Sequence, residues 1–149
     1  MKNSKSAFTM IELIFVIIIV GVLASVAVAK FGAMKTASDI ANARSDVAAI
    51  RSAIISERQR SLVQGTASYM SKLTPNAATS TILFTGDGAG RTLLTYGFTK
   101  GTGAGEWTII SDTQYKYNSG DDVTTFDYNA TTGSFNCTAG LNDCDKLAN

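Results

Sequence analysis

FTMIELIFVIIIVGVLASVAVA, residues 8–29, decides how this chain is organised. Glu12 is the only charged residue in the stretch, and as an α-helix the stretch is about 33 Å long at 1.5 Å per residue. That length is enough to cross the hydrocarbon core of a bilayer. Lys2 and Lys5 precede the stretch and no comparable basic cluster follows it closely. We therefore expect a cytoplasmic N-terminus, with the rest of the chain crossing to the other side of the membrane.

Three kinds of N-terminal segment fit this pattern, and they predict different mature proteins. A secretory signal peptide needs a small-residue cleavage site, which Ala27-Val28-Ala29 supplies. A permanent signal anchor needs no cleavage. Glu12 favours a third kind of segment, in which the charge has a function, because a charged side chain costs about 2.5–3.5 kcal/mol at mid-membrane. A position in the interfacial zone would also tolerate this charge.

The pattern after the apolar stretch predicts that the same helix continues. Apolar residues recur at steps of three and four, and polar residues occupy the other face. The predicted apolar positions are Ala37, Ile40, Ala43, Val47, Ile50 and Ile54, and the predicted polar ones are Lys35, Asp39, Asn42, Ser45, Asp46 and Ser52. Arg58 and Arg60, followed by Gly65, indicate a helix C-terminus. We therefore predict a nearly continuous helix over 8–64, which a signal-peptidase cut after Ala29 would sever.

The N-terminal sequence AFTMIEL, residues 7–13, followed by the apolar stretch, resembles the class III leader of type IV prepilins and type II secretion pseudopilins. The resemblance implies a leader over 1–7, cleavage by prepilin peptidase between Ala7 and Phe8, and N-methylation of Phe8. It also implies that Glu12, the fifth mature residue, pairs with the N-terminal amine of a neighbouring subunit. Two positions differ from the family: Ala7 stands where glycine is usual, and Ala29 stands about where major subunits often carry proline.

The C-terminal half has the composition of an antiparallel sheet. Short alternating or aromatic runs are separated by Gly-, Asp- and Thr-rich turns, and parallel crossovers would need longer connections. The predicted strands are 81–85, 93–98, 106–111, 114–118, 124–129 and 134–137. Because one face of the sheet must be covered, we expect it to pack on the apolar stripe of the helix.

The expected fold is therefore α+β and pilin-like: a long N-terminal helix, first transmembrane and then amphipathic, packed against a C-terminal antiparallel β-sheet head. The expected parts are a prepilin leader over 1–7, a transmembrane or filament-core helix over 8–29, an amphipathic helix over 30–65 and a β-rich head over 66–149.

Cys137 and Cys144 are the two cysteines of the chain. An even pair beside an export-type N-terminus predicts a disulfide formed in an oxidising compartment, and the alternative is two free thiols in the cytosol. The pair also resembles the disulfide-bounded C-terminal region of many pilins.

The composition argues against an enzyme. The chain has no histidine, which removes the commonest general base near neutral pH and the commonest transition-metal ligand. We expect no catalytic residues, no cofactor, no metal and no small-molecule substrate. The glycine-rich run over 101–105 has no following Lys-Ser/Thr and precedes a strand, so nucleotide binding is not expected. No basic block interleaved with aromatic residues marks a nucleic-acid surface.

Two further patterns stay open. Asp121, Asp122 and Asp127 offer the hard oxygen ligands that calcium prefers, although turn capping is the favoured explanation. Asn129-Ala130-Thr131 and Asn136-Cys137-Thr138 fit the N-glycosylation acceptor pattern, and Asp127 precedes the first at the spacing that bacterial oligosaccharyltransferases favour.

A structural filament subunit explains these features together. The expected partners are other copies of the chain, prepilin peptidase, the inner-membrane assembly platform and, for the monomer, the inner membrane itself. Before assembly the head is expected in the periplasm of a bacterium. A type IV pilus, a type II secretion pseudopilus and a DNA-uptake filament all remain possible, and a monomeric membrane-anchored binding module is the alternative from another class.

Overall fold

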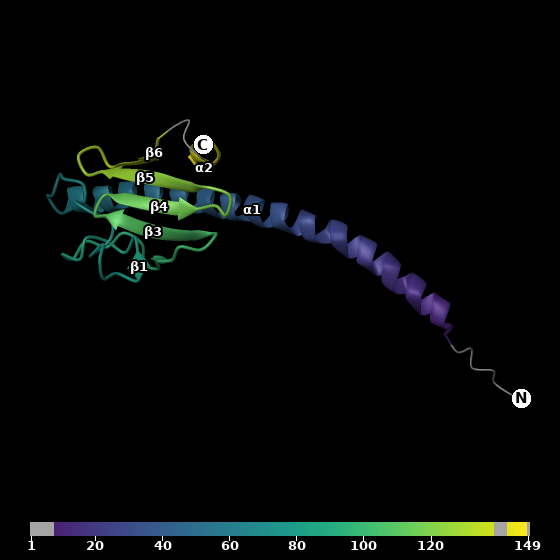
Figure 1. The fold of residues 1–149 in the computed structure, drawn as a ribbon. Coiled ribbons are helices and arrows are strands. Elements are labelled where there is room, and N and C mark those ends of the chain that lie inside the picture. The colour runs from purple at the N-terminus through teal and green to yellow at the C-terminus, as the bar shows by residue number, and fades with distance from the viewer. Residues whose placement is uncertain (1–7, 139–142, 149) are drawn as a thin grey trace, which may run out of the picture. The chain divides into compact units, whose positions relative to one another are not determined.

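The computed structural model describes residues 8–138 and 143–148. Its elements are, in order, α1 (Met10–Val63), β1 (Ile82–Leu83), β2 (Phe98–Thr99), β3 (Glu106–Ser111), β4 (Gln114–Asn118), β5 (Val123–Asn129), β6 (Ser134–Cys137) and α2 (Cys144–Leu147) (Figure 1). The chain divides into two compact units, an N-terminal unit that ends at Lys35 and a C-terminal unit that begins at Thr36. Helix α1 runs through both units. The expected α+β class, with one long N-terminal helix and antiparallel strands after it, is confirmed.

Hydrogen bonds satisfy backbone groups at both ends of α1. At the start, the backbone N–H of Glu12 donates to the Thr9 carbonyl and hydroxyl oxygens, at 3.1 and 3.3 Å. At the end of the helix, Gly65 has φ +83°. The N–H of Thr66 donates to the Ser61 carbonyl at 2.8 Å, and the N–H of Gly65 donates to the Leu62 carbonyl. This is a Schellman motif, in which glycine adopts the left-handed conformation without a steric penalty.

The main sheet is antiparallel throughout, in the order β3-β4-β5-β6. Tight turns join its strands, and the registers pair Thr108 with Lys116, Tyr115 with Phe126 and Tyr128 with Phe135. The predicted strands over 106–111, 114–118 and 134–137 coincide with β3, β4 and β6, and the strand predicted over 124–129 begins one residue earlier as β5.

The prediction was wrong for the first two strands. The strand predicted over 81–85 is reduced to β1, and most of the one predicted over 93–98 is loop that ends in β2. These two form a separate short sheet, which pairs Ile82 with Thr99 and Leu83 with Phe98. Phe84 has φ +62°, which interrupts an extended strand. The N–H groups of Leu93 and Leu94 instead donate to the carbonyls of residues 85 and 84.

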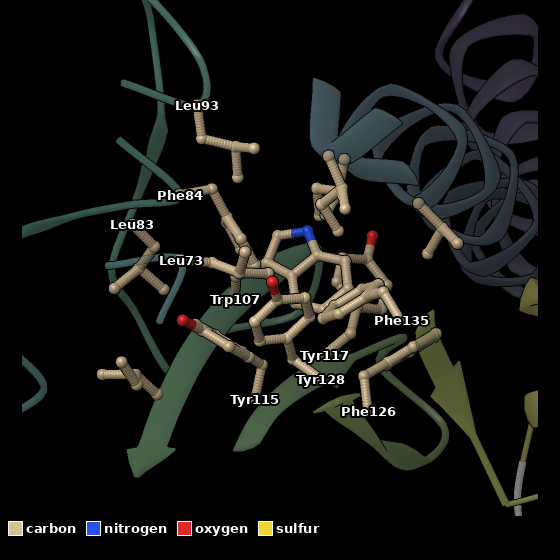
Figure 2. Close-up of a cluster of buried hydrophobic side chains, with 14 of the residues drawn as sticks. Leu73, Leu83, Phe84, Leu93, Trp107, Tyr115, Tyr117, Phe126, Tyr128 and Phe135 are labelled. Carbon is tan, nitrogen blue, oxygen red and sulfur yellow. The ribbon is translucent and has the colours of Figure 1, made fainter. Parts of the chain in front are cut away.

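The core of the C-terminal unit lies between α1 and the inner face of the main sheet. Figure 2 shows Trp107, Tyr117 and Phe126 converging with Phe84 and Phe135. Trp107 has its ring centroid 5.0 Å from that of Tyr117 and 5.3 Å from that of Phe126. The helix contributes Ala43, Val47, Ile50 and Ile54 to the same cluster. The expected packing of the sheet on the apolar stripe is therefore confirmed.

Three helix positions, Ala37, Asp39 and Asp46, differ from the predicted pattern, and Asp39 is partly buried instead of exposed. Ala37 was expected on the apolar face but is exposed. Two successive steps of three residues separate Ala37 from Ala43, and each step falls short of a full turn, so the two lie about 120° apart around the helix. Asp46 was expected on the solvent-facing side but is half-buried, and it accepts a hydrogen bond from Trp107 Nε1 at 2.9 Å. Burial raises the pKa of Asp46, and the bond from Trp107 opposes that rise.

Candidate processing and assembly segment

The residues around the predicted cleavage site lie at the start of α1. Ala7 lies outside the described residues, while Phe8 is described and is 72 % exposed. Thr9 caps the helix, which places Glu12 in its first turn. The carboxylate of Glu12 is exposed and forms no hydrogen bond or ion pair with any residue in 8–138 or 143–148. A negative charge near a helix N-terminus is favourable, because the backbone N–H groups there create a partial positive charge.

The segment after Glu12 exposes nearly all of its apolar side chains. Exposed large apolar residues in this part of α1 include Leu13, Ile14, Phe15, Val16, Ile17, Ile18, Ile19, Val20, Val22, Leu23, Val26 and Val28. Helix α1 is long and apolar enough to cross a membrane, and within the described chain none of its most apolar stretch is buried. The core helix of a soluble protein would bury these side chains. So large an exposed apolar surface requires a membrane or other protein surfaces as its neighbour.

The C-terminal segment is fastened to the sheet and to α1. A disulfide joins Cys137 at the end of β6 to Cys144 at the start of α2, which confirms the predicted pairing. Arg51 of α1 donates to the carbonyls of Phe135 and Ala148, at 2.9 and 3.1 Å. One arginine therefore binds the last strand and the end of α2 together.

Further contacts hold α2 in place. The guanidinium of Arg44 donates to the Lys146 carbonyl. Ser119 donates to the Asp143 carboxylate at 2.6 Å, and Lys146 Nζ lies 2.6 Å from the same side chain. The hydrogen bonds from Lys146 and Ser119 lower the pKa of Asp143. The side chain of Leu147 adds an apolar contact, since it belongs to the core cluster.

A buried ion pair joins α1 to the loop between β1 and β2. Glu57 is 3 % exposed, and both of its carboxylate oxygens accept hydrogen bonds from Arg91, each at 2.7 Å. Ser61 also donates to Glu57, and Arg91 donates to the carbonyl of Ser68. Burial acts to raise the pKa of Glu57, but the hydrogen bonds from Arg91 and Ser61 outweigh it and the pKa is lowered.

This ion pair was not predicted from the sequence, although a signal for it existed. Glu57 and Ser61 continue the steps of three and four that run through Val47, Ile50 and Ile54. A carboxylate on the buried stripe of a helix needs a cation, because an unpaired buried charge is costly. Nothing in the sequence identifies Arg91, 34 residues away, as that cation.

The three aspartates considered for calcium do not converge. Asp121 and Asp122 precede β5, whereas Asp127 lies near its far end, where its carboxylate accepts a hydrogen bond from Gln114 at 2.8 Å. The carboxylate of Asp122 accepts from the backbone N–H of Val123. Among the residues that the structure describes, no group of three or more His, Cys, Asp or Glu side chains could hold a metal ion. The geometry therefore gives no support to a metal site in this part of the chain.

The glycine-rich loop before β3 binds a carboxylate of its own chain. The backbone N–H of Gly103 donates to Glu106 Oε2 at 2.7 Å. A phosphate-binding loop would instead direct such N–H groups at its ligand and continue into a helix. This loop continues into β3, as the sequence predicts.

Comparison with known proteins bears on the N-terminal segment. Residues 2–28 match the family model of the prokaryotic N-terminal methylation motif. This match supports a class III prepilin-like leader at the N-terminus of the chain. This leader is the one found in type IV pilins and pseudopilins, so the match supports membership in that family and processing by prepilin peptidase. No curated protein and no solved structure gives a significant match to the chain.

The matched motif has consequences for the class of protein. A pilin-type motif suggests a structural protein, and with the exposed apolar helix it fits anchoring in a membrane before assembly. The match ends at residue 28, so it says nothing of the C-terminal unit.

Proposed function

We propose that the chain is the structural subunit of a type IV pilus-like or type II secretion-like pseudopilus filament. Prepilin peptidase cuts between Ala7 and Phe8 and methylates the new amine of Phe8. The mature chain then consists of a transmembrane or filament-core helix over 8–29, an amphipathic helix over 30–65 and a head over 66–149. Self-assembly on an inner-membrane platform extracts subunits from the membrane into a helical filament.

The observation that carries this proposal is Glu12. Its carboxylate has no partner in the described chain and lies in the first turn of a helix whose apolar side chains are exposed. In a bilayer such a charge costs about 2.5–3.5 kcal/mol at the midplane. In the proposed filament, the Phe8 amine of a cleaved neighbour supplies the cation that pairs with this carboxylate. Two unit charges about 4 Å apart attract by roughly 4 kcal/mol at an effective dielectric of 20.

The same pairing sets the register between subunits. Apolar contacts along two such helices are almost as good after a shift of one turn, since residues 13–28 carry no charge and are mostly apolar. A charge pair is lost by the same shift and leaves two ions unpaired in an apolar environment. Glu12 therefore selects one arrangement among many of similar apolar contact.

Membrane orientation follows from the leader. Lys2 and Lys5 lie before the apolar stretch, which keeps the N-terminus in the cytoplasm and sends the C-terminal unit into the periplasm. The Cys137–Cys144 disulfide supports this location, because disulfides form and persist in the bacterial periplasm. After assembly, neighbouring subunits replace lipid as the surroundings of the exposed apolar helix.

Substitution of Glu12 tests the proposal. In Glu12→Leu the apolar stretch becomes uninterrupted, so the variant should enter the membrane at the wild-type level. Assembly should fall at least about tenfold, since a net loss of 1.4 kcal/mol per contact is a factor of ten. The matched control is Glu12→Asp, which keeps the charge and should assemble measurably better than Glu12→Leu. Membrane fractionation and the amount of sheared or cross-linked filament are the measurements.

The outcomes separate a filament subunit from a monomeric membrane-anchored binding module. If Glu12→Leu assembles as well as the wild type, Glu12 does not direct assembly. If neither the wild type nor Glu12→Asp forms filaments or cross-linked ladders in cells with an active assembly platform, the chain is a monomeric anchor.

A further inference from the structure

The turn between β5 and β6 carries an acceptor sequence that assembly does not use. Residues 127–131 read DYNAT, with Asn129 two residues after an acid and two residues before Thr131. Asn129 is the last residue of β5, and both Asn129 and Thr131 are exposed. Asp127 and Asn129 are two positions apart on one strand, so their side chains lie on the same, outward face of the sheet.

The hydrogen bonds of Asn129 leave its amide nitrogen available. Asn129 Oδ1 accepts from the backbone N–H groups of Thr131 and Thr132, at 2.8 and 3.2 Å. The backbone carbonyl of Asn129 accepts from Gly133, which closes the turn. Neither Asn129 Nδ2 nor the Thr131 hydroxyl forms a hydrogen bond with another residue of the described chain. The turn therefore fixes the side chain through its oxygen and presents its nitrogen to solvent.

The second acceptor sequence of the chain provides an internal contrast. Asn136 lies inside β6, paired with Asp127 of β5, and its Oδ1 accepts from Arg51 Nη2 at 2.9 Å. Its middle residue is Cys137, which is held in the disulfide. Ser134, not an acid, stands two residues before it. Asn136 is exposed as well, so what sets it apart from Asn129 is its position inside a strand, the disulfide at the middle residue of its acceptor sequence and the lack of an acid two residues before it.

The surface beside Asn129 has room for a polar substituent. A shallow hollow of about 520 Å³ is lined by Asp127, Asn129, Ser134, Asn136 and Thr138, among others. Hydroxyl, amide and carboxylate groups such as these form hydrogen bonds with sugar hydroxyls. A glycan on Asn129 Nδ2 would leave both hydrogen bonds of Oδ1 intact, so the turn does not have to change.

We propose that Asn129 is an N-glycosylation site, modified by an oligosaccharyltransferase that requires an acid two residues before the asparagine. The co-substrate is a lipid-pyrophosphate-linked oligosaccharide. A bond forms between Asn129 Nδ2 and the anomeric carbon of the first sugar, and the bond from that carbon to the pyrophosphate oxygen breaks. The lipid pyrophosphate leaves, and a proton from the amide passes to solvent through the enzyme. In cells this inference rests on the proposed function, because the C-terminal unit must reach the periplasm.

The test avoids that dependence by using the purified full chain in detergent. The chain is mixed with a solubilised bacterial oligosaccharyltransferase of this acid-requiring class, a lipid-linked oligosaccharide and a short Asp-x-Asn-x-Thr peptide as internal control. Intact mass and glycopeptide sequencing give the readout. We expect one glycan on the wild type and on Asn136→Gln, located at Asn129. Neither cleavage nor filament assembly enters this reaction, so failure of the proposed function does not alter its result.

Three variants identify the groups required. Asn129→Gln should carry no glycan. Thr131→Val should also carry none, although it keeps the backbone N–H groups that hold Asn129 and is nearly isosteric. Asp127→Asn should give about tenfold less product at early times, the effect of losing one charge-assisted contact. A wild-type chain that stays unmodified while the peptide is glycosylated would overturn the proposal, and so would a glycan found at Asn136.

Discussion

Glu57 and Arg91 show how single residues hold the C-terminal unit together. Their two hydrogen bonds connect α1 to a loop that contributes little regular structure, the residues between β1 and β2. The arginine side chain is 23 % exposed and the glutamate side chain 4 %, so the pair is partly shielded from water. Removing one partner of such a pair leaves the other charge without compensation, and that loss is larger than the net contribution of the pair.

Glu57→Gln should lower the free energy of unfolding by about 2–3 kcal/mol at pH 7, somewhat less than for a fully buried pair. Trp107 is the only tryptophan of the chain and lies in the core, so its fluorescence reports unfolding of the C-terminal unit in urea with the chain in detergent. The control is Asp112→Asn, an exposed carboxylate that forms no hydrogen bond or ion pair among the described residues, which should change the unfolding free energy by less than about 0.5 kcal/mol. Equal effects of the two substitutions would contradict the role given to the ion pair.

The difference in stability between the wild type and Glu57→Gln should depend on pH. Because the folded state lowers the pKa of Glu57, its contribution to stability is present above the unfolded-state pKa of about 4.5 and is lost as the pH falls through the folded-state value. The wild type should therefore lose its advantage over Glu57→Gln as the pH is lowered from 5 towards 3. A difference that stays constant over this range would mean that the carboxylate acts through packing alone.

At the scale of elements, α2 is a four-residue helix that local sequence cannot stabilise. It persists because the disulfide, Arg51 and the buried Leu147 hold it against β6 and α1. The disulfide constrains the unfolded chain, while the other two contacts act in the folded state. The two kinds of contact can therefore be separated by experiment.

The double substitution Cys137→Ser with Cys144→Ser should lower the unfolding free energy by about 2–3 kcal/mol, the loop-closure value for a cross-link over so short a segment. Hydrogen exchange should locate the effect. The N–H of Ala148, which donates to the Cys144 carbonyl, should lose protection. The N–H groups of β4 should still exchange only when the whole unit unfolds. Reduced wild type serves as the control and should behave like the double variant. Loss of protection throughout the sheet would show that the disulfide supports the whole unit.

The elements that the sequence predicted well are those with a strong local signal. Alternation of apolar and polar residues identified β3 to β6, and Gly65 identified the end of α1 to within a residue or so. Prediction failed between residues 66 and 99, because that region is held by contacts distant in sequence. The sequence around Thr74 does not indicate a structural role for this residue. In the structure, its hydroxyl accepts hydrogen bonds from the Phe84 N–H at 3.0 Å and from the Tyr115 hydroxyl at 3.2 Å.

The residues of the candidate site also fall into those that the sequence could predict and those that it could not. The leader motif and Glu12 could be found from the sequence because their spacing is fixed along one segment, and the methylation-motif match covers that segment. The Glu57–Arg91 pair and the Arg51 contacts could not, since they join residues 34 and 97 positions apart. The difference between the two acceptor asparagines required the structure only in part, because the sequence shows the acid before Asn129 and the cysteine after Asn136 but not the hydrogen bond from Arg51 to Asn136.

At the scale of the whole molecule, the two units meet different physical requirements. The C-terminal unit buries its own aromatic core, whereas the N-terminal unit leaves its apolar side chains exposed. A chain of this kind is stable only when something else covers the N-terminal helix. In the proposed function, lipid does so for the monomer and neighbouring helices do so in the filament.

The N-terminal mass and sequence of the mature protein, isolated from its native envelope, test this account most directly. The account predicts a chain that begins at Phe8 with an N-methylated amine, because prepilin peptidase removes residues 1–7. A chain that begins at Lys30 would contradict it, since the helix would be severed and Glu12 discarded with a signal peptide. An intact Met1 would contradict it as well and would leave a membrane-anchored monomer.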